Sequence, residues 1–124
     1  DYEIDYLLSE YKLDISKIST GEFTALMLNF IKNSIDANAS DMKFKIHKIK
    51  NNVLSILIID NGNGIPLNIQ DNIFKQDSSS KSKNRGNGLH INRFIANEAG
   101  GDIKLKHSSS EGTVFELSIP IIKL

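Results

Sequence analysis

The sequence contains no cysteine among its 124 residues, which excludes a disulfide-stabilised scaffold and a thiolate zinc site. No apolar run approaches the roughly 20 residues of a membrane-spanning helix, and no secretory signal pattern is visible. The 15 Lys and Arg side chains balance 15 Asp and Glu side chains, so net charge gives no argument for binding nucleic acid or a membrane surface. These absences favour a cytoplasmic domain that does not bind nucleic acid.

The length and the 40% hydrophobic content are those of one domain with a single core. The sequence begins at Asp1 rather than at methionine, so we expect a longer protein, whose membrane anchor, if any, lies elsewhere. Residues 1–20 are expected to form an N-terminal strand and linker segment of the domain that residues 21–124 build. A strand is predicted there because three apolar residues alternate with polar ones, namely Ile4, Tyr6 and Leu8.

A helix is predicted from Phe23 to Ala37, with Thr20 as its N-cap. Its apolar residues cover most of the cylinder, so we expect it to be largely buried; those that widen the apolar face are Leu28, Ile31 and Ile35. The polar residues that remain share one stripe of the helix: Asn29, Asn33 and Asp36. Either neighbouring backbone satisfies these amides, or they line a ligand or metal site.

A nearly unbroken apolar run predicts a buried strand at 53–59. Alternating apolar residues predict three more strands, at 42–47, 103–106 and 115–119, with Pro120 ending the last one. A second helix is predicted between the glycines near 86–88 and Ala99, with Gly100 and Gly101 stopping it. The order of elements predicts an α+β fold. We expect a two-layer α/β sandwich with a mixed, mostly antiparallel sheet and helices on one face.

The most informative stretch follows the apolar run from Val53 to Ile59, which ends in Asp60. Gly62 and Gly64 come next, and glycine allows positive φ and close approach of a ligand. A carboxylate beside two bare backbone positions suits a flat ligand edge that carries an amine. An ordinary Asp-Asn-Gly turn explains these residues equally well. A calcium loop is excluded, because glycines occupy positions where oxygen ligands belong.

A second glycine pair, Gly86 and Gly88, lies at the start of the second helix, where free N–H groups and the helix dipole favour anions. The preceding polar segment carries Lys81 and Arg85, which could close over a polyphosphate, or it is only a surface loop. A plain loop–helix junction remains an alternative for the glycines. Neither a P-loop nor a dinucleotide fingerprint is present.

In its order of motifs, the sequence resembles the Bergerat-type (GHKL) ATP-binding family. The motifs are an asparagine-striped helix, D-x-G-x-G after a strand, a polar segment, G-x-G-L at a helix start, and the pair Gly112-Thr113. That family includes gyrase, MutL, heat-shock chaperone ATPases and sensor histidine kinases. The resemblance covers about residues 22–120. It implies that the cofactors are ATP and Mg²⁺.

The resemblance implies a role for each matching residue. Asp60 would accept a hydrogen bond from the adenine amine, aided by Thr113 and by the loop that holds Gly62, Gly64 and Ile65. Asn33 would bind Mg²⁺, and Asn29 would lie beside the phosphates or the metal. The phosphates would be held by the helix-start residues and the preceding cations, namely Gly86, Gly88, Leu89, Lys81 and Arg85. Phe74 resembles the phenylalanine box that anchors the lid.

Asn29 stands where the hydrolases of the family place a glutamate general base, so fast hydrolysis is not expected. The resemblance is closest to the catalytic domain of sensor histidine kinases, which transfer the γ-phosphoryl group of Mg-ATP to a histidine. None of the three histidines, His47, His90 and His107, has the surroundings of a phosphoacceptor, so we expect the acceptor on a separate dimerisation domain. The resemblance further implies a homodimer only at full length and a response regulator as partner. The alternative is a weak ATPase or nucleotide-gated interaction module, similar to MutL or the anti-sigma kinases, which the run from Asn33 to Ala37 favours.

Overall fold

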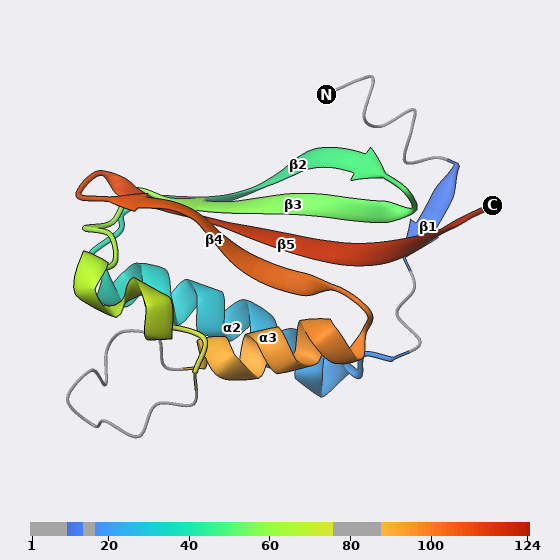
Figure 1. Ribbon diagram of the computed structural model, residues 1–124, viewed down its shortest axis with the longest axis horizontal. Helices are drawn as coiled ribbons and strands as arrows, with labels where there is room; N and C mark the ends of the chain where they lie inside the picture. The colour runs from blue at the N-terminus through green and yellow to red at the C-terminus, as the bar shows by residue number, and fades with distance from the viewer. Residues whose placement is uncertain (1–9, 14–16, 76–87) are drawn as a thin grey trace.

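Both helices, α2 and α3, lie on one face of an antiparallel sheet in the computed structural model, which describes residues 10–13, 17–75 and 88–124 (Figure 1). The sheet order is β1-β5-β3-β2, and β4 also pairs with β5. Every strand pair among the described residues is antiparallel. The elements are β1 (Tyr11–Leu13), α2 (Thr20–Asp36), β2 (Met42–Lys50), β3 (Val53–Asp60), η1 (Leu67–Asn72), α3 (Leu89–Glu98), β4 (Asp102–Ser109) and β5 (Gly112–Lys123). The predicted α+β two-layer sandwich is confirmed.

Helix α2 begins earlier than its apolar pattern suggested. Ser19, rather than Thr20, is the N-cap: its Oγ accepts from the Glu22 backbone N–H at 3.1 Å, and Glu22 Oε1 accepts from the Ser19 N–H at 2.9 Å. This reciprocal capping box satisfies two N–H groups that would otherwise lack partners at the helix start. The prediction of Thr20 as the cap was wrong because a second hydroxyl, one residue earlier, is followed at the right distance by the glutamate.

Strands β2 and β3 form the hairpin expected from the sequence. Asn51 and Asn52 connect them with φ of 53° and 61°, the left-handed pair that a tight two-residue hairpin needs. The register pairs Met42 with Asp60, so the carboxylate lies at the very end of β3. On the other side of β3, Asp60 pairs with Thr113 of β5.

Strand β5 continues past Pro120, where the sequence predicted its end. Pro120 pairs with Val53, Ile121 donates its N–H to the Asn52 carbonyl at 3.0 Å, and the last residues of β5 pair with β1. Proline has an extended-compatible φ and lacks only one N–H. The ladder therefore survives because the following residue supplies the next donor. The predicted strand over Ile4, Tyr6 and Leu8 lies outside the described residues.

The core lies between the sheet and the two helices. Its fully buried side chains are led by Phe30 of α2, Leu89 of α3 and Ile103 of β4. The expectation that α2 is mostly buried was wrong, because Leu28, Ile31 and Ile35 are 57%, 38% and 64% exposed. One sheet and one neighbouring helix cover only part of a helix surface, so these residues, on the far side of α2, find no partner within the described residues.

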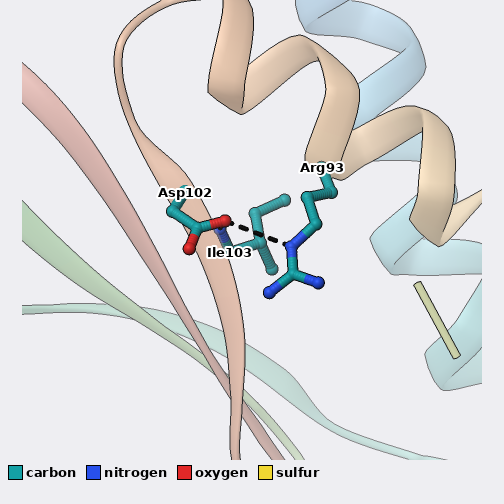
Figure 2. A network of polar contacts seen from close by, with 3 residues as sticks. All are labelled: Arg93, Asp102 and Ile103. Atoms are coloured by element: carbon teal, nitrogen blue, oxygen red, sulfur yellow. Dashed lines mark hydrogen bonds and ion pairs between the residues drawn. The ribbon is translucent and has the colours of Figure 1, made fainter. Parts of the chain in front are cut away.

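Helix α3 is tied to β4 by a polar contact at its outer side (Figure 2). Arg93 Nε donates to Asp102 Oδ1 at 3.2 Å, and the same oxygen accepts the backbone N–H of Ile103 at 2.8 Å. The Arg93 guanidinium also lies 4.2 Å from the centre of the Phe74 ring, which in turn meets Phe115 edge-on at 6.2 Å. Arg93 therefore joins the chain segment before the undescribed residues 76–87 to the helix after them.

The sheet face opposite the helices carries one buried acid, Glu116. Ser55 Oγ donates to its carboxylate, and Lys106 lies 3.8 Å away. The Ser55 hydrogen bond lowers the pKa of Glu116 below its ordinary value, and the charges of Lys106, Lys48 and His47 act in the same direction against the effect of burial. The strand residues His47 and His107 are solvent-exposed. Neither described helix is long and apolar enough to cross a bilayer.

Candidate functional site

The carboxylate of Asp60 is held in a fixed orientation at the end of β3. Its Oδ1 accepts the backbone N–H groups of Gly62 at 2.9 Å and of Thr113 at 3.2 Å. Its Oδ2 accepts the hydroxyl of Ser34, on α2, at 2.8 Å. A carboxylate has about four lone-pair positions. Three are filled by these residues, so one position on Oδ2 receives no donor from residues 10–13, 17–75 and 88–124 and suits a further donor.

A second chain of hydrogen bonds fixes the loop after Asp60. The Ile65 N–H donates to Ser108 Oγ at 2.8 Å, and that hydroxyl is 2.9 Å from Thr113 Oγ1. Gly64, at φ +83°, lies so close to the β4–β5 turn that a β-carbon there would be 2.0 Å from the Ser109 carbonyl oxygen. Gly62 is packed against Ala37 in the same way, at 2.7 Å from its carbonyl oxygen. Both glycines therefore serve close backbone packing, which makes this loop a rigid wall.

Asp60 borders a small pocket between α2, the loop and the first turn of α3. The lining residues come from five parts of the chain and are Asn33, Ala37, Asp60, Ile65, Leu89, Thr113 and Phe115. Its volume is about 10 Å³, close to the space of one water molecule. A larger hollow of about 590 Å³ adjoins it and shares Ala37 and Ile65 as walls. Displacing the Ile65 side chain would therefore join the two spaces.

The three polar residues of the α2 stripe point to different places. Asn33 lines the pocket with Asp60, and its Nδ2 donates to the Asn29 backbone carbonyl at 2.9 Å. Asp36 lines the larger hollow. Asn29 instead packs on the start of α3, where its Nδ2 donates to the Gly88 carbonyl at 3.2 Å and to Asn92 Oδ1 at 2.9 Å. For both asparagines the amide nitrogen is used within the protein, and the oxygen makes no hydrogen bond to a described residue.

The start of α3 is shaped as the sequence predicted, as far as it is described. Gly88 is the N-cap residue at φ +85°, and a β-carbon on it would lie 2.5 Å from Asn29 Cγ. Leu89 follows at the pocket wall and is 1% exposed. The other predicted phosphate-binding residues, Lys81, Arg85 and Gly86, lie outside the described residues.

The donor set suits a hard cation held mainly by oxygen. Among the described residues, no three His, Cys, Asp or Glu side chains gather into a metal site. The oxygens of Asn29 and Asn33 are neutral amide ligands of the kind that Mg²⁺ accepts, when phosphate and water complete its shell. The site therefore fits a ligand that brings its own negative oxygens and presents an amine to Asp60.

Three residues that shape this region were not predicted from the sequence. Ser34 is 5% exposed and orients Asp60, and its signal was a lone hydroxyl on the buried stripe of α2 between Phe30 and Ala37. Asn92 is completely buried and meets Asn29, and its signal was an amide at a core position of the second helix. Ser108 left no signal, because a serine in a predicted turn is ordinary turn chemistry.

Comparison with known proteins places these features in a family. The sequence model described as "Histidine kinase-, DNA gyrase B-, and HSP90-like ATPase" matches residues 21–123. The signal transduction histidine-protein kinase ArlS of Staphylococcus aureus strain USA300 is 36% identical over 124 residues, which cover 94% of this chain and 27% of ArlS. The ArlS sequence of strain COL gives the same figures. The chain thus spans about a quarter of the length of the curated relatives it matches.

Solved structures agree with this placement. The catalytic domain of histidine kinase ThkA is 27% identical, with a TM-score of 0.62 over 81% of this chain and 66% of the ThkA chain. Full-length ShkA, in complex with AMPPNP, matches 84% of this chain and 22% of its own, with a TM-score of 0.68 and 20% identity. The likeness to ShkA concerns the fold.

Proposed function

Because the chain belongs to the histidine kinase-, DNA gyrase B- and HSP90-like ATPase family, we propose that it is the ATP-binding catalytic domain of a sensor histidine kinase. The reaction is transfer of the γ-phosphoryl group of Mg-ATP to a histidine on a separate dimerisation domain. The single observation that carries nucleotide recognition is the half-satisfied Oδ2 of Asp60. The kinase branch is supported by the asparagine at position 29 and by the 36% identity to ArlS.

Adenine is selected by the one acceptor position that Asp60 keeps. The 6-amino group of adenine donates a hydrogen bond and matches a carboxylate oxygen. Guanine presents a carbonyl oxygen at the same place, so two acceptors would face one another in a partly buried site. Because Ser34, Gly62 and Thr113 fix the carboxylate, it cannot turn to relieve that repulsion.

The phosphate end of the nucleotide lies toward α3. The amide oxygens of Asn33 and Asn29 would hold Mg²⁺ together with phosphate oxygens and water. The metal, when bound, neutralises charge on the transferring phosphoryl group. The Gly88-Leu89 start of α3 offers N–H groups to the phosphates, with Lys81, Arg85 and Gly86 proposed to act beside it.

Hydrolysis is slow in this proposal because no strong base stands at position 29. An amide does not accept a proton at neutral pH, whereas a neutral imidazole is itself a nucleophile. Catalysis then consists of positioning and charge neutralisation around a largely dissociative transfer. Water is a poor nucleophile without a base, so phosphoryl transfer to histidine is favoured over loss to water.

Nucleotide entry requires the small pocket to open. The space beside Asp60 holds about one water in this structure, while the adjoining hollow is about 590 Å³. Movement of Ile65 or Leu89 would admit the base.

The cytoplasmic location, the response regulator and a homodimer formed by the whole protein belong to the same proposal.

Calorimetric titration of this chain with ATP, ADP and GTP in the presence and absence of Mg²⁺ tests the proposal. We expect ATP and ADP to bind, Mg²⁺ to strengthen ATP binding, and GTP to bind much more weakly. The chain alone should hydrolyse ATP far more slowly than the roughly 10 turnovers per second of an ordinary enzyme. Equal binding of GTP and ATP contradicts the recognition by Asp60, and turnover at the ordinary rate contradicts the kinase assignment.

A further inference from the structure

Asn92 is a fully buried amide in the middle of α3, on the face that packs against α2. Its exposed fraction is 0%, and it is among the largest completely buried side chains of the described residues. A buried amide is costly unless its polar atoms are paired. Both side-chain hydrogen bonds that Asn92 makes with described residues go to α2, so its role is in the joint between the two helices.

The hydrogen bonds of Asn92 form a directional series. Asn92 Nδ2 donates to the Leu26 backbone carbonyl at 3.1 Å, and Asn92 Oδ1 accepts from Asn29 Nδ2 at 2.9 Å. The Leu26 carbonyl can only accept, so it fixes the nitrogen of Asn92 toward α2 at that point. The Oδ1 of Asn92 then faces Asn29, and because this oxygen can only accept, Asn29 must donate from its Nδ2.

Within the described part of the chain, the side chain of Asn29 is left with one polar atom that has no hydrogen-bond partner. Its two amide hydrogens are used by the Gly88 carbonyl at 3.2 Å and by Asn92. The nitrogen of Asn29 is therefore not free to donate to a phosphate. What remains is the Oδ1 acceptor, which suits a cation or an N–H or O–H donor and is repelled by phosphate oxygen.

We propose that Asn92 is a positioning residue that commits Asn29 to act as an oxygen acceptor toward the metal side of the nucleotide site. The proposal rests on the proposed nucleotide-binding function and deepens it. Asn92 does not touch the nucleotide. It acts by accepting the second side-chain N–H of Asn29. Because Asn29 also donates to the Gly88 carbonyl, the pair of asparagines holds the first turn of α3 as well.

The test compares Asn92→Val, which has nearly the same volume but no polar atoms, with Ile95→Val. Ile95 is buried on the same side of α3 and is 4% exposed, so its variant loosens the same helix without removing an amide. AMPPNP and ADP are titrated with and without Mg²⁺ at a temperature where both variants are folded. We expect Asn92→Val to weaken the Mg²⁺-dependent part of AMPPNP binding about three- to tenfold, as for one hydrogen bond of ordinary strength. Metal-free ADP binding should stay within about twofold, a factor too small to reflect a lost hydrogen bond.

Two further measurements separate positioning from simple destabilisation. The side-chain amide NMR signals of Asn29 should shift in Asn92→Val and stay in place in Ile95→Val. In the background of Asn29→Ala, Asn92→Val should cause no further loss of Mg²⁺-dependent affinity, because its target is gone. Equal losses in Asn92→Val and Ile95→Val, or full additivity with Asn29→Ala, would overturn the inference. Failure of the wild-type chain to bind Mg-AMPPNP would instead overturn the proposed function.

Discussion

Replacement of Asp60 by asparagine exchanges one acceptor for a donor at the centre of the proposed base site. The substituted side chain keeps almost the same shape. Its oxygen can still accept the N–H groups of Gly62 and Thr113, which Oδ1 accepts in the wild type. The Ser34 hydroxyl can rotate and accept from the new amide nitrogen, so the local fold should persist.

The loss of nucleotide affinity follows from the position that faces the base. The adenine amine would lose a hydrogen bond to a charged group and would meet an N–H donor instead. A hydrogen bond to a charged group contributes about 1.5–3 kcal/mol. We therefore expect ADP to bind about 10- to 150-fold more weakly in Asp60→Asn. The preference for ADP over GDP should fall as well, because the new donor matches the guanine carbonyl.

The assay is calorimetric titration of the variant with ADP and GDP, together with a thermal unfolding curve. Asp71→Asn is a matched control, since it makes the same chemical change at an exposed position of η1. It should leave both affinities unchanged. A folded Asp60→Asn chain that binds ADP as tightly as the wild type would refute the assignment of Asp60 to base recognition.

Three other predictions concern stability. Gly64→Ala should unfold at a markedly lower denaturant concentration than the wild type, because its β-carbon would lie 2.0 Å from the Ser109 carbonyl oxygen at a backbone φ of +83°. The control Gly21→Ala, in the open first turn of α2, should be neutral or stabilising. Equal unfolding curves for the two variants would contradict the tight packing at Gly64. The folded-state pKa of Glu116 is lowered chiefly by Ser55, so its stabilisation is present above the ordinary glutamate pKa and is lost as pH falls through the folded-state value. Glu116→Gln should flatten that acid limb in pH-dependent denaturation, and an unchanged limb would refute the link. Arg93→Met should lower the free energy of unfolding measured in urea by about 1 kcal/mol, since the ion pair with Asp102 is more than a third exposed and screened, and the contact with the Phe74 ring contributes most. A loss above about 3 kcal/mol would show another role.

Local patterns were sufficient for most elements. Alternation of apolar residues located β2, β4 and β5, because a strand with one buried face must alternate, and a continuous apolar run located the central strand β3. The tight β2–β3 turn followed from two asparagines, which tolerate the left-handed region better than most residues. Errors arose at the ends of elements: Ser19 replaced Thr20 as the cap, and Pro120 lies inside β5. Such ends depend on which single donor or acceptor finds a partner.

The site shows a similar division. Motifs predicted five residues of the site: Asp60, Gly62, Gly64, Gly88 and Thr113. They could be predicted because close backbone packing requires glycine and because the end of a buried strand is recognisable in the sequence. Their predicted roles as ligand contacts remain a proposal. The residues that orient the side chains of the site lie far away along the chain: Ser34 orients Asp60, and Asn92 orients Asn29. No spacing rule connects such partners.

By itself, the sequence determined which segments alternate, which turns need glycine or asparagine, and where a carboxylate ends a buried strand. These properties are local, since they depend on neighbours within a few residues and on the period of burial. Only the tertiary structure decided that Asn29 turns its nitrogen to α3, that the outer side of α2 stays exposed, and that Asp60 keeps a single acceptor position. Those outcomes depend on hydrogen bonds and contacts between distant elements, whose geometry exists only once the sheet and helices have packed.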